Sequence, residues 1–406
     1  MKKTIYFDHA ATTPVDKKVL EEMLPYFSEK FGNPMSVHSF GQEALEVIDS
    51  AREKVADFFG ASTSEIIFTS GATESNNLAI KGIVKSYYSD PKKKGKLPHL
   101  ITTTFEHHCI LDTFKSLEKE GLAEITLLSV GKKGIVNLDD IKKEIKGNTI
   151  LISIMYVNNE IGTVQPIKKI GELIKKINEK RQEEKKRKII FHSDATQAVN
   201  HFNCNVKEIV VDMLSMSAHK IYGPKGTGML YIKKDTPIKN IQNGGDQEYK
   251  MRGGTHNVPG IVGLGKAVSM IKERKKENEN ISKLSDYLVR RILKEIPDSY
   301  LNGDSKNKSP AINNFRFNNV EGEGLLLSLD IEGIAASTGS ACSSGALDPS
   351  HVLLSLGLKH EQAHGSLRIS LGKDNTKEEI DIFIEKLKET ISRLRKISGN
   401  VLADFK

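Results

Sequence analysis

Apolar residues in the first part of the chain alternate between helical spacing and short continuous runs. Between Gly41 and Phe59 they recur at helical intervals and Gly60 follows, which predicts an amphipathic helix with a glycine stop. A second helical pattern covers 167–184 and is flanked by apolar runs of strand length. Strand, helix and strand at this spacing indicate βαβ units, and therefore a mainly parallel sheet covered by helices. The runs that we expect to form strands are 66–68, 150–157, 189–191, 209–213 and 229–232.

The last part of the chain carries a separate pattern. A long helical stripe covers about 258–296, and the polar segment 302–309 follows it. Strand-like runs and helical stripes then alternate to the end of the chain, which predicts a second, smaller α/β domain. The expected strands lie near 311–317 and 366–371, and the expected helices near 322–329 and 376–394.

Composition narrows the class of protein. The chain has 406 residues, of which 38% are hydrophobic and 28% charged, as in globular proteins with a large core. Its three cysteines are too few and too scattered for a disulfide framework or a structural zinc site, so we expect a reducing compartment and no metal. Asp8 and His9 interrupt the basic start before the apolar core of a signal peptide can develop. We therefore predict a cytoplasmic protein.

The net charge of +8 adds little to this picture. Its densest clusters, 92–94 and 185–188, lie in polar connecting segments without aromatic residues between the charges. Such clusters are typical of solvated loops, so we expect no direct contact with nucleic acid. The longest uncharged apolar stretch, around 149–157, is also far too short to cross a membrane.

Three polar tracts follow predicted strands and carry candidate chemistry. The tract 69–77 reads as a glycine turn and a helix start, where backbone N–H groups can hold a phosphate. Asp194 and Gln197 follow the strand at 189–191, and Lys220 lies in a loop rich in hydroxyl, imidazole and glycine groups. Each tract alone also fits an ordinary capped helix or surface loop. Together, at the carboxyl ends of neighbouring strands, they provide the amine, the acid and the phosphate donors that pyridoxal 5′-phosphate (PLP) requires.

Six motifs in this order make the chain similar to cysteine desulfurases of the NifS/IscS type. They cover nearly the whole sequence and are FDHAATTP at 7–14, SGATESNN at 70–77, VNNEIG at 157–162, HSDATQ at 192–197, SAHKIYGPKG at 217–226 and GSACSSG at 339–345. The resemblance implies a fold-type I PLP enzyme that works as a homodimer. It also implies a large PLP-binding domain at 15–257 and a small domain built from 1–14 and 258–406.

The resemblance assigns roles to individual residues. Lys220 is expected to form the Schiff base with PLP, Asp194 to pair with the pyridinium nitrogen and Gln197 to bind the ring oxygen. His107 is expected to stack on the ring and to move a proton to or from sulfur. The phosphate is expected to be bound by Ala72, Thr73, Ser217, His219 and, from the neighbouring subunit, Thr255. Asn158 and Arg368 are expected to bind the substrate carboxylate, with Asn158 also close to the cofactor.

Cys342 is the predicted sulfur acceptor. It lies among small residues in a long loop, about 337–350, without an apolar face that could hide a core thiol. We expect this loop to be mobile, because one sulfur must reach the substrate and then an external acceptor. The other two cysteines, Cys109 and Cys204, are expected to be small buried or half-buried side chains.

The resemblance implies that L-cysteine is converted to L-alanine and that Cys342 carries the sulfur as a persulfide to an acceptor, either an iron–sulfur scaffold or a tRNA-thiolation enzyme. Two alternatives remain open. One is a related PLP reaction, such as selenocysteine lysis or β-elimination, and the other is a dimeric binding protein with a degenerate site. The chain departs from the family in having Tyr249 where an arginine is common, and in ending at Lys406 with a short tail. Both departures concern the docking of partners.

Overall fold

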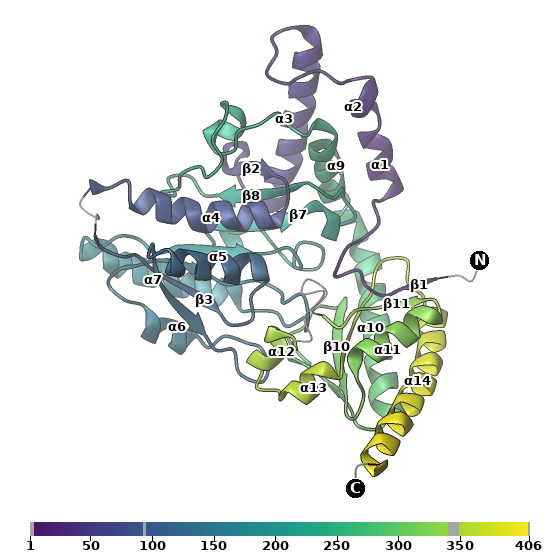
Figure 1. Ribbon diagram of the computed structural model, residues 1–406. Coiled ribbons are helices and arrows are strands. Elements are labelled where there is room, and N and C mark those ends of the chain that lie inside the picture. Colours follow the sequence, from purple (N-terminus) through teal and green to yellow (C-terminus); the bar gives the residue numbers. More distant parts are fainter. Residues whose placement is uncertain (1–3, 92–94, 340–348, 405–406) are drawn as a thin grey trace.

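The computed structural model describes residues 4–91, 95–339 and 349–404. Within these residues the strands form one seven-stranded sheet, one three-stranded sheet and one two-stranded sheet. Figure 1 shows that helices cover the large sheet, and that the smaller sheets lie with the C-terminal helices at one end of the molecule. The α/β fold class predicted from the sequence is therefore confirmed.

The large sheet is mainly parallel. Its strand order is β2-β8-β7-β6-β5-β3-β4. Parallel pairing runs from β4 through β3, β5 and β6 to β7, whereas β8 is antiparallel to both of its neighbours. The strands are β2 (Ile66–Thr69), β3 (His99–Thr103), β4 (Glu124–Leu128), β5 (Thr149–Ser153), β6 (Ile190–Asp194), β7 (Met213–Ser217) and β8 (Gly228–Ile232).

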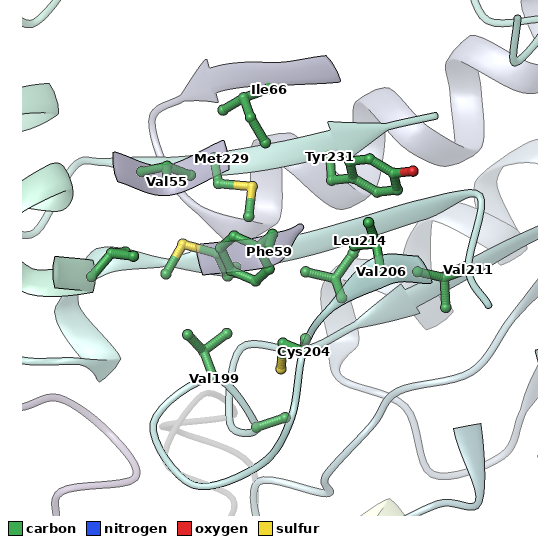
Figure 2. Close-up of a cluster of buried hydrophobic side chains, with 14 of the residues drawn as sticks. Val55, Phe59, Ile66, Val199, Cys204, Val206, Val211, Leu214, Met229 and Tyr231 are labelled. Atoms are coloured by element: carbon green, nitrogen blue, oxygen red, sulfur yellow. The ribbon is translucent and has the colours of Figure 1, made fainter. Parts of the chain in front are cut away.

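Both faces of this sheet are buried, which explains why its strands read as continuous apolar runs. Ile67 packs with α4 (Ala72–Tyr87) and α5 (His108–Lys119) on one face. Its neighbours Ile66 and Phe68 point to the opposite face, which is covered by α3 (Ser39–Phe59), α7 (Ile167–Glu183) and α9 (Val258–Ser269). Figure 2 shows Val55 and Phe59 of α3 against the sheet, and Cys204 is buried in the same cluster.

The predicted helix before Gly60 is confirmed. α3 buries Ala44, Ile48, Ala51 and Val55 along one stripe, and Gly60 ends it in the left-handed conformation with φ of 66°. The remaining elements of this part are α1 (Lys17–Met23), α2 (Pro25–Ser28), α6 (Leu138–Glu144), α8 (Val206–Ile209) and the 3₁₀ turns Thr63–Glu65 and Ala218–Lys220. In the turn Gln247–Lys250, Glu248 and Tyr249 take left-handed conformations.

A second core joins the two ends of the chain. Ile5 and Phe7 pack with residues that come after position 280. Here β10 (Ile312–Phe317) pairs antiparallel with β9 (Ser299–Leu301) and β12 (Ser366–Ser370), and β1 (Ile5–Tyr6) pairs in parallel with β11 (Ile334–Ala335). The helices are α10 (Lys275–Glu295), α11 (Gly322–Ile331), α12 (His351–Ser355), α13 (His360–His364) and α14 (Lys377–Asp404). Across the described residues, none of the helices has an apolar stretch long enough to cross a bilayer.

Two expectations about local structure are corrected. The apolar run 209–213 is not a strand, because Asn205 caps the short helix α8 and Val210 takes a left-handed conformation before β7 begins at Met213. The stripe at 258–296 is not one helix, because the 3₁₀ turn Lys272–Arg274 separates α9 from α10.

The domain boundary expected at 257/258 stays a prediction, and the cores show how the helix that follows it packs. The side chains of α9, from Val258 to Val268, belong to the core of the large sheet. α9 packs closely on α3, since a Cβ on Gly265 would lie 2.8 Å from Cβ of Ala51. After α9, the next residue that belongs to the second core is Ile281 in α10.

Candidate active site

A cavity of about 590 Å³ lies at the carboxyl ends of β6 and β7, between the start of α4 and residues 10–12. Ligands of parallel sheets bind at this edge, beyond the carboxyl ends of the strands. Most of the predicted site residues line the cavity, namely Ala72, Thr73, His107, Asp194, Gln197, Ser217, His219, Lys220 and Arg368. The sequence motifs therefore converge in space as expected.

Lys220 enters the cavity from the 3₁₀ turn that follows β7. Its Nζ donates hydrogen bonds to the carbonyl oxygens of Ala10 and Ala11, at 2.6 and 2.5 Å. Gln197 Nε2 also donates to the Ala10 carbonyl, at 2.9 Å. The motif at 7–14 thus crosses the cavity and fixes the position of the lysine amine.

Asp194 is the last residue of β6 and its carboxylate is held from two sides. The backbone N–H of Thr196 donates to Oδ1 at 2.9 Å, and Asn76 Nδ2 donates to Oδ2 at 2.7 Å. Asn76 lies on α4, so the helix that starts at the phosphate turn also orients the acid. Asn76 lies within the motif at 70–77, but nothing in the pattern of that motif assigns it this role.

A second acid, Glu106, lies behind this site and is fully buried. Burial raises the pKa of Glu106 to about 8, although Met155 and Thr103 donate hydrogen bonds to its carboxyl group. Glu106 is therefore mostly protonated at neutral pH. Glu106 is not among the residues that line the cavity, whereas Asp194 is.

His107 caps the N-terminus of α5. Its Nδ1 accepts the backbone N–H of Cys109 at 3.1 Å and lies 3.0 Å from Cys109 Sγ. Burial lowers the pKa of His107, and the charge of Lys220 acts in the same direction against that of Asp194. The ring is therefore neutral at physiological pH and available for proton transfer.

The start of α4 forms an anion site. Gly71 is the N-cap of α4, and no side chain among the described residues caps this helix. The backbone N–H groups of its first turn are therefore free of a side-chain cap at the edge of the cavity, where they can bind an anion. Ser217 and His219 line the same cavity from the end of β7. Gly228 lets β8 approach this turn, because a Cβ there would lie 2.6 Å from Gly71 Cα.

Arg368 reaches the cavity from β12 in the second core. Its Nη2 lies 2.8 Å from Asp8 Oδ1, and its Nη1 donates to the Asn159 carbonyl at 2.9 Å. The side chain is only 4% exposed, so Asp8 is its main counter-charge. The sequence motif at 7–14 contains Asp8, yet nothing in the pattern identified this pairing.

Asn158 does not line the cavity, in contrast to what we expected. Its Nδ2 donates to the Phe105 carbonyl at 2.9 Å, and its Oδ1 accepts the N–H groups of Glu160 and Ile161. These bonds hold the side chain inside the turn, and the next residue, Asn159, lines the cavity instead. In this structure Asn158 therefore shapes the loop, and its predicted contact with cofactor or substrate stays a prediction.

Two predicted site residues remain, Thr255 and Cys342. Thr255 is exposed and is not among the residues that line the cavity. Its predicted contact is with the phosphate bound by a neighbouring subunit, so this contact stays a prediction. Cys342 and most of its loop lie outside the described residues. Of the remaining cysteines, Cys204 is buried and Cys109 is half-buried, as expected, and Cys109 also lines the cavity.

The donors of the cavity fit PLP. The site offers an amine, an acid at a strand end and an uncapped helix N-terminus, which match the aldehyde, the ring nitrogen and the phosphate of the cofactor. Two buried atoms of the lining residues, Thr196 Oγ1 and Asn159 Oδ1, find no hydrogen-bond partner within the described part of the chain. Buried polar groups are normally satisfied, so these atoms also point to a polar ligand.

Comparison with known proteins agrees with this geometry. The model of the aminotransferase class-V family matches residues 5–383. The cysteine desulfurase IscS of Dictyoglomus turgidum is 50% identical over 399 residues, which cover 98% of this chain and 97% of the relative. The human cysteine desulfurase is 44% identical over 400 residues, covering 98% of this chain and 83% of the human protein.

Solved structures show the same relationship. A NifS-like protein superposes with a TM-score of 0.87 at 36% identity and covers 96% of this chain and 100% of its own. SspA in complex with cysteine has a TM-score of 0.77 at 38% identity, with 92% and 100% coverage. This chain therefore belongs to the PLP-dependent class-V aminotransferase family and, within it, to the cysteine desulfurases.

Proposed function

We propose that this protein converts L-cysteine to L-alanine and takes the released sulfur onto Cys342 as a persulfide. The observation that carries the proposal is the meeting of Lys220, Asp194 and Arg368 at one cavity. An amine, an acid and a guanidinium in this arrangement suit a PLP enzyme whose substrate carries an α-carboxylate.

Different residues around the cavity would bind different parts of the cofactor. Asp194 would keep the ring nitrogen protonated, and the first turn of α4 with Ser217 and His219 would bind the phosphate. Bound PLP would supply an electron sink for the electron pair left at the substrate Cα after deprotonation. The amine of Lys220 is the base that we assign to the Cα proton, because the carbonyls of Ala10 and Ala11 already fix its position.

Arg368 is the residue that we assign to the substrate carboxylate. Its guanidinium presents paired N–H donors that match a carboxylate, and Nε is buried without a partner within the described residues. Arg368 and Asp8 come from the second core, whereas Lys220 comes from the first. The substrate would therefore be bound between the two cores.

Sulfur transfer requires a thiolate. The Cys342 thiolate would attack the substrate sulfur, forming an S–S bond while the Cβ–S bond breaks. The electron pair of the broken bond goes to the carbon side and is protonated at Cβ, and return of a proton to Cα then gives alanine. The product on the enzyme is a persulfide, so no external oxidant or reductant is needed for this half of the cycle.

The other two cysteines are poor candidates for this step. Burial raises the pKa of Cys204 to about 12, and burial with the charge of Asp194 does the same for Cys109. Both are therefore thiols at neutral pH, and only a thiolate is an effective sulfur nucleophile. This supports Cys342 as the sulfur carrier.

The remaining parts of the proposal concern the surroundings of the enzyme. We propose a homodimer in which Thr255 of one subunit completes the phosphate site of the other. The persulfide would pass to a sulfur-acceptor protein, either an iron–sulfur scaffold or a tRNA-thiolation enzyme. A persulfide cycle needs Cys342 reduced, so a reducing, cytoplasmic location suits it.

The test is to mix purified, PLP-loaded protein with L-cysteine and a thiol reductant, and to measure alanine and sulfide together. We expect equal amounts of the two products, and no product from the Lys220→Ala variant. Pyruvate and ammonia in place of alanine would indicate β-elimination instead. Alanine from selenocysteine but none from cysteine would also contradict the proposal.

A further inference from the structure

Cys109 lies at the centre of the candidate site, although the proposed reaction gives it no role. It belongs to the first turn of α5 and its half-buried side chain lines the cavity. Its sulfur lies 3.0 Å from His107 Nδ1 and 3.1 Å from Asn76 Nδ2. The same Asn76 nitrogen lies 2.7 Å from Asp194 Oδ2. The thiol thus connects the histidine to the amide that orients the acid.

The direction of these hydrogen bonds follows from the donors. Asn76 Nδ2 is a donor, so the sulfur accepts from it and keeps its own S–H for another partner. Burial and the charge of Asp194 raise the pKa of Cys109 to about 12, so the proton stays on sulfur at neutral pH. The Thr73 hydroxyl also hydrogen-bonds this side chain and favours the thiolate, so it acts as a second donor to the sulfur. His107 Nδ1, 3.0 Å away, is then an acceptor for the S–H.

His107 Nδ1 therefore faces two donors. The backbone N–H of Cys109 points to it at 3.1 Å, and the thiol of the same residue approaches it at 3.0 Å. A nitrogen that accepts hydrogen bonds cannot carry a proton of its own, so the neutral ring must hold its proton on Nε2. Protonation of Nδ1 would make the contact with the Cys109 backbone N–H repulsive, and the thiol would have to turn its S–H away and accept the hydrogen bond instead.

We propose that Cys109 is a positioning residue for His107: its S–H reinforces the helix cap and holds the neutral ring in the Nε2–H form. His107 would then present Nε2–H as a fixed hydrogen-bond donor to the reacting sulfur, a role that requires the neutral ring with Nδ1 unprotonated. This inference deepens the proposed function and rests on it. It assigns to Cys109 neither sulfur transfer nor contact with the substrate.

Other charged groups near His107 also influence its pKa. Burial opposes its protonation most strongly, Lys220 and His108 also oppose it, and Asp194 and Asp112 favour it. His351 of α12 also faces His107, and charges on the two rings oppose each other. None of these groups changes when Cys109 is replaced. Loss of the thiol should therefore appear as an isolated rise in the pKa of His107, because one donor to Nδ1 is removed.

The test is ¹⁵N NMR of histidine-labelled, PLP-loaded protein, with the His107 signal assigned by its loss in His107→Gln. We expect the Nε2–H tautomer in the wild type. Cys109→Ala should raise the pKa of His107 by about 0.4 to 1 unit, the effect of losing one hydrogen bond of ordinary strength. The acid limb of the kcat/KM profile should move to higher pH by the same amount. Cys109→Ser, which keeps a donor, should move both values back toward the wild type.

Cys204→Ala is the matched control, because this cysteine is buried in the core of the large sheet and its loss should leave the His107 titration unchanged. A wild-type His107 protonated on Nδ1 would overturn the proposal without any variant. So would a Cys109→Ala titration that superimposes on the wild type, or a Cys109→Ser that behaves like alanine. Absence of alanine formation by the wild type would instead refute the proposed function, and the NMR result would stand independently.

Discussion

The most quantitative prediction concerns the buried ion pair between Arg52 of α3 and Glu248. The two side chains form two parallel hydrogen bonds, Nη1 to Oε2 at 2.8 Å and Nη2 to Oε1 at 2.7 Å, and are 6% and 2% exposed. Glu248 also accepts the Phe68 N–H at 2.7 Å and lies 3.0 Å from His256 Nε2. The Tyr249 ring lies 5.3 Å from the Arg52 guanidinium carbon. The departure from the family at Tyr249 thus lies against this ion pair.

Replacing Glu248 by Gln leaves the Arg52 charge buried without its partner. Removing one member of a buried pair destabilises a protein by about 3–5 kcal/mol. The pKa of Glu248 supports the same size of effect. Burial alone would raise this pKa, but the bonds from Arg52 and His256 and the charge of Arg52 lower it from 4.5 to about 2. At 1.36 kcal/mol per unit, this shift corresponds to about 3 kcal/mol.

The sign of the pH dependence follows from the lowered pKa. The stabilisation is complete above about pH 4.5, where the carboxylate is ionised in both folded and unfolded chains. It is lost as the pH falls toward 2, because the folded state must then take up the proton that the unfolded state already carries. The difference between wild type and Glu248→Gln should therefore shrink between pH 5 and pH 2.

Urea unfolding followed by circular dichroism at several pH values measures this difference. Glu43→Gln is the control, because its partner Lys30 and Glu43 itself are 44% and 47% exposed and such surface pairs contribute about 0–1 kcal/mol. A loss below about 1 kcal/mol for Glu248→Gln at pH 7, equal to that of the control, would refute the reasoning. So would a difference that does not depend on pH.

The remaining predictions concern the site. Lys220→Ala should abolish alanine formation and remove the visible absorbance of lysine-bound PLP; normal turnover would contradict its assignment. Cys342→Ser should still bind L-cysteine but release little alanine, and mass spectrometry should find no persulfide on the protein. A persulfide on Cys109 would show that Cys109, and not Cys342, is the nucleophile. Arg368→Lys should raise KM for L-cysteine about 10- to 100-fold in steady-state assays, because the paired donors for the carboxylate are lost; an unchanged KM would argue against carboxylate binding. Light scattering should show a dimer, and a fully active monomer would exclude the role of Thr255.

Much of the fold and site could be predicted because the relevant signals are local. Lys220 and Asp194 each follow an apolar strand closely, and parallel strands place such residues at one edge. The strand expected at 209–213 shows the limit of the same reasoning. Its residues are apolar, but the cap at Asn205 and the left-handed Val210 decide the backbone there. A buried helix turn and a buried strand have the same composition over so few residues.

Contacts between distant positions could not be predicted from the pattern. Asn76 and Asp194 are 118 positions apart, and Arg52 and Glu248 are 196 apart. The contrast between Asn158 and Asn159 is also invisible in the sequence, since it depends on which side chain bonds the Phe105 carbonyl. The position of Cys109 beside His107 Nδ1 likewise follows from the geometry of a helix cap, which periodicity does not contain.

The N-terminal segment has a consequence for synthesis of the chain. Asp8 binds Arg368 across 360 positions, and β1 pairs with β11. Ala10 and Ala11 meet Lys220 across about 210 positions. On the ribosome, at about 5–20 residues per second, the start of the chain must wait on the order of tens of seconds for Arg368 to be made. The catalytic pocket is therefore among the last parts to close, and until then the apolar Ile5 and Phe7 stay exposed to chaperones and to neighbouring nascent chains.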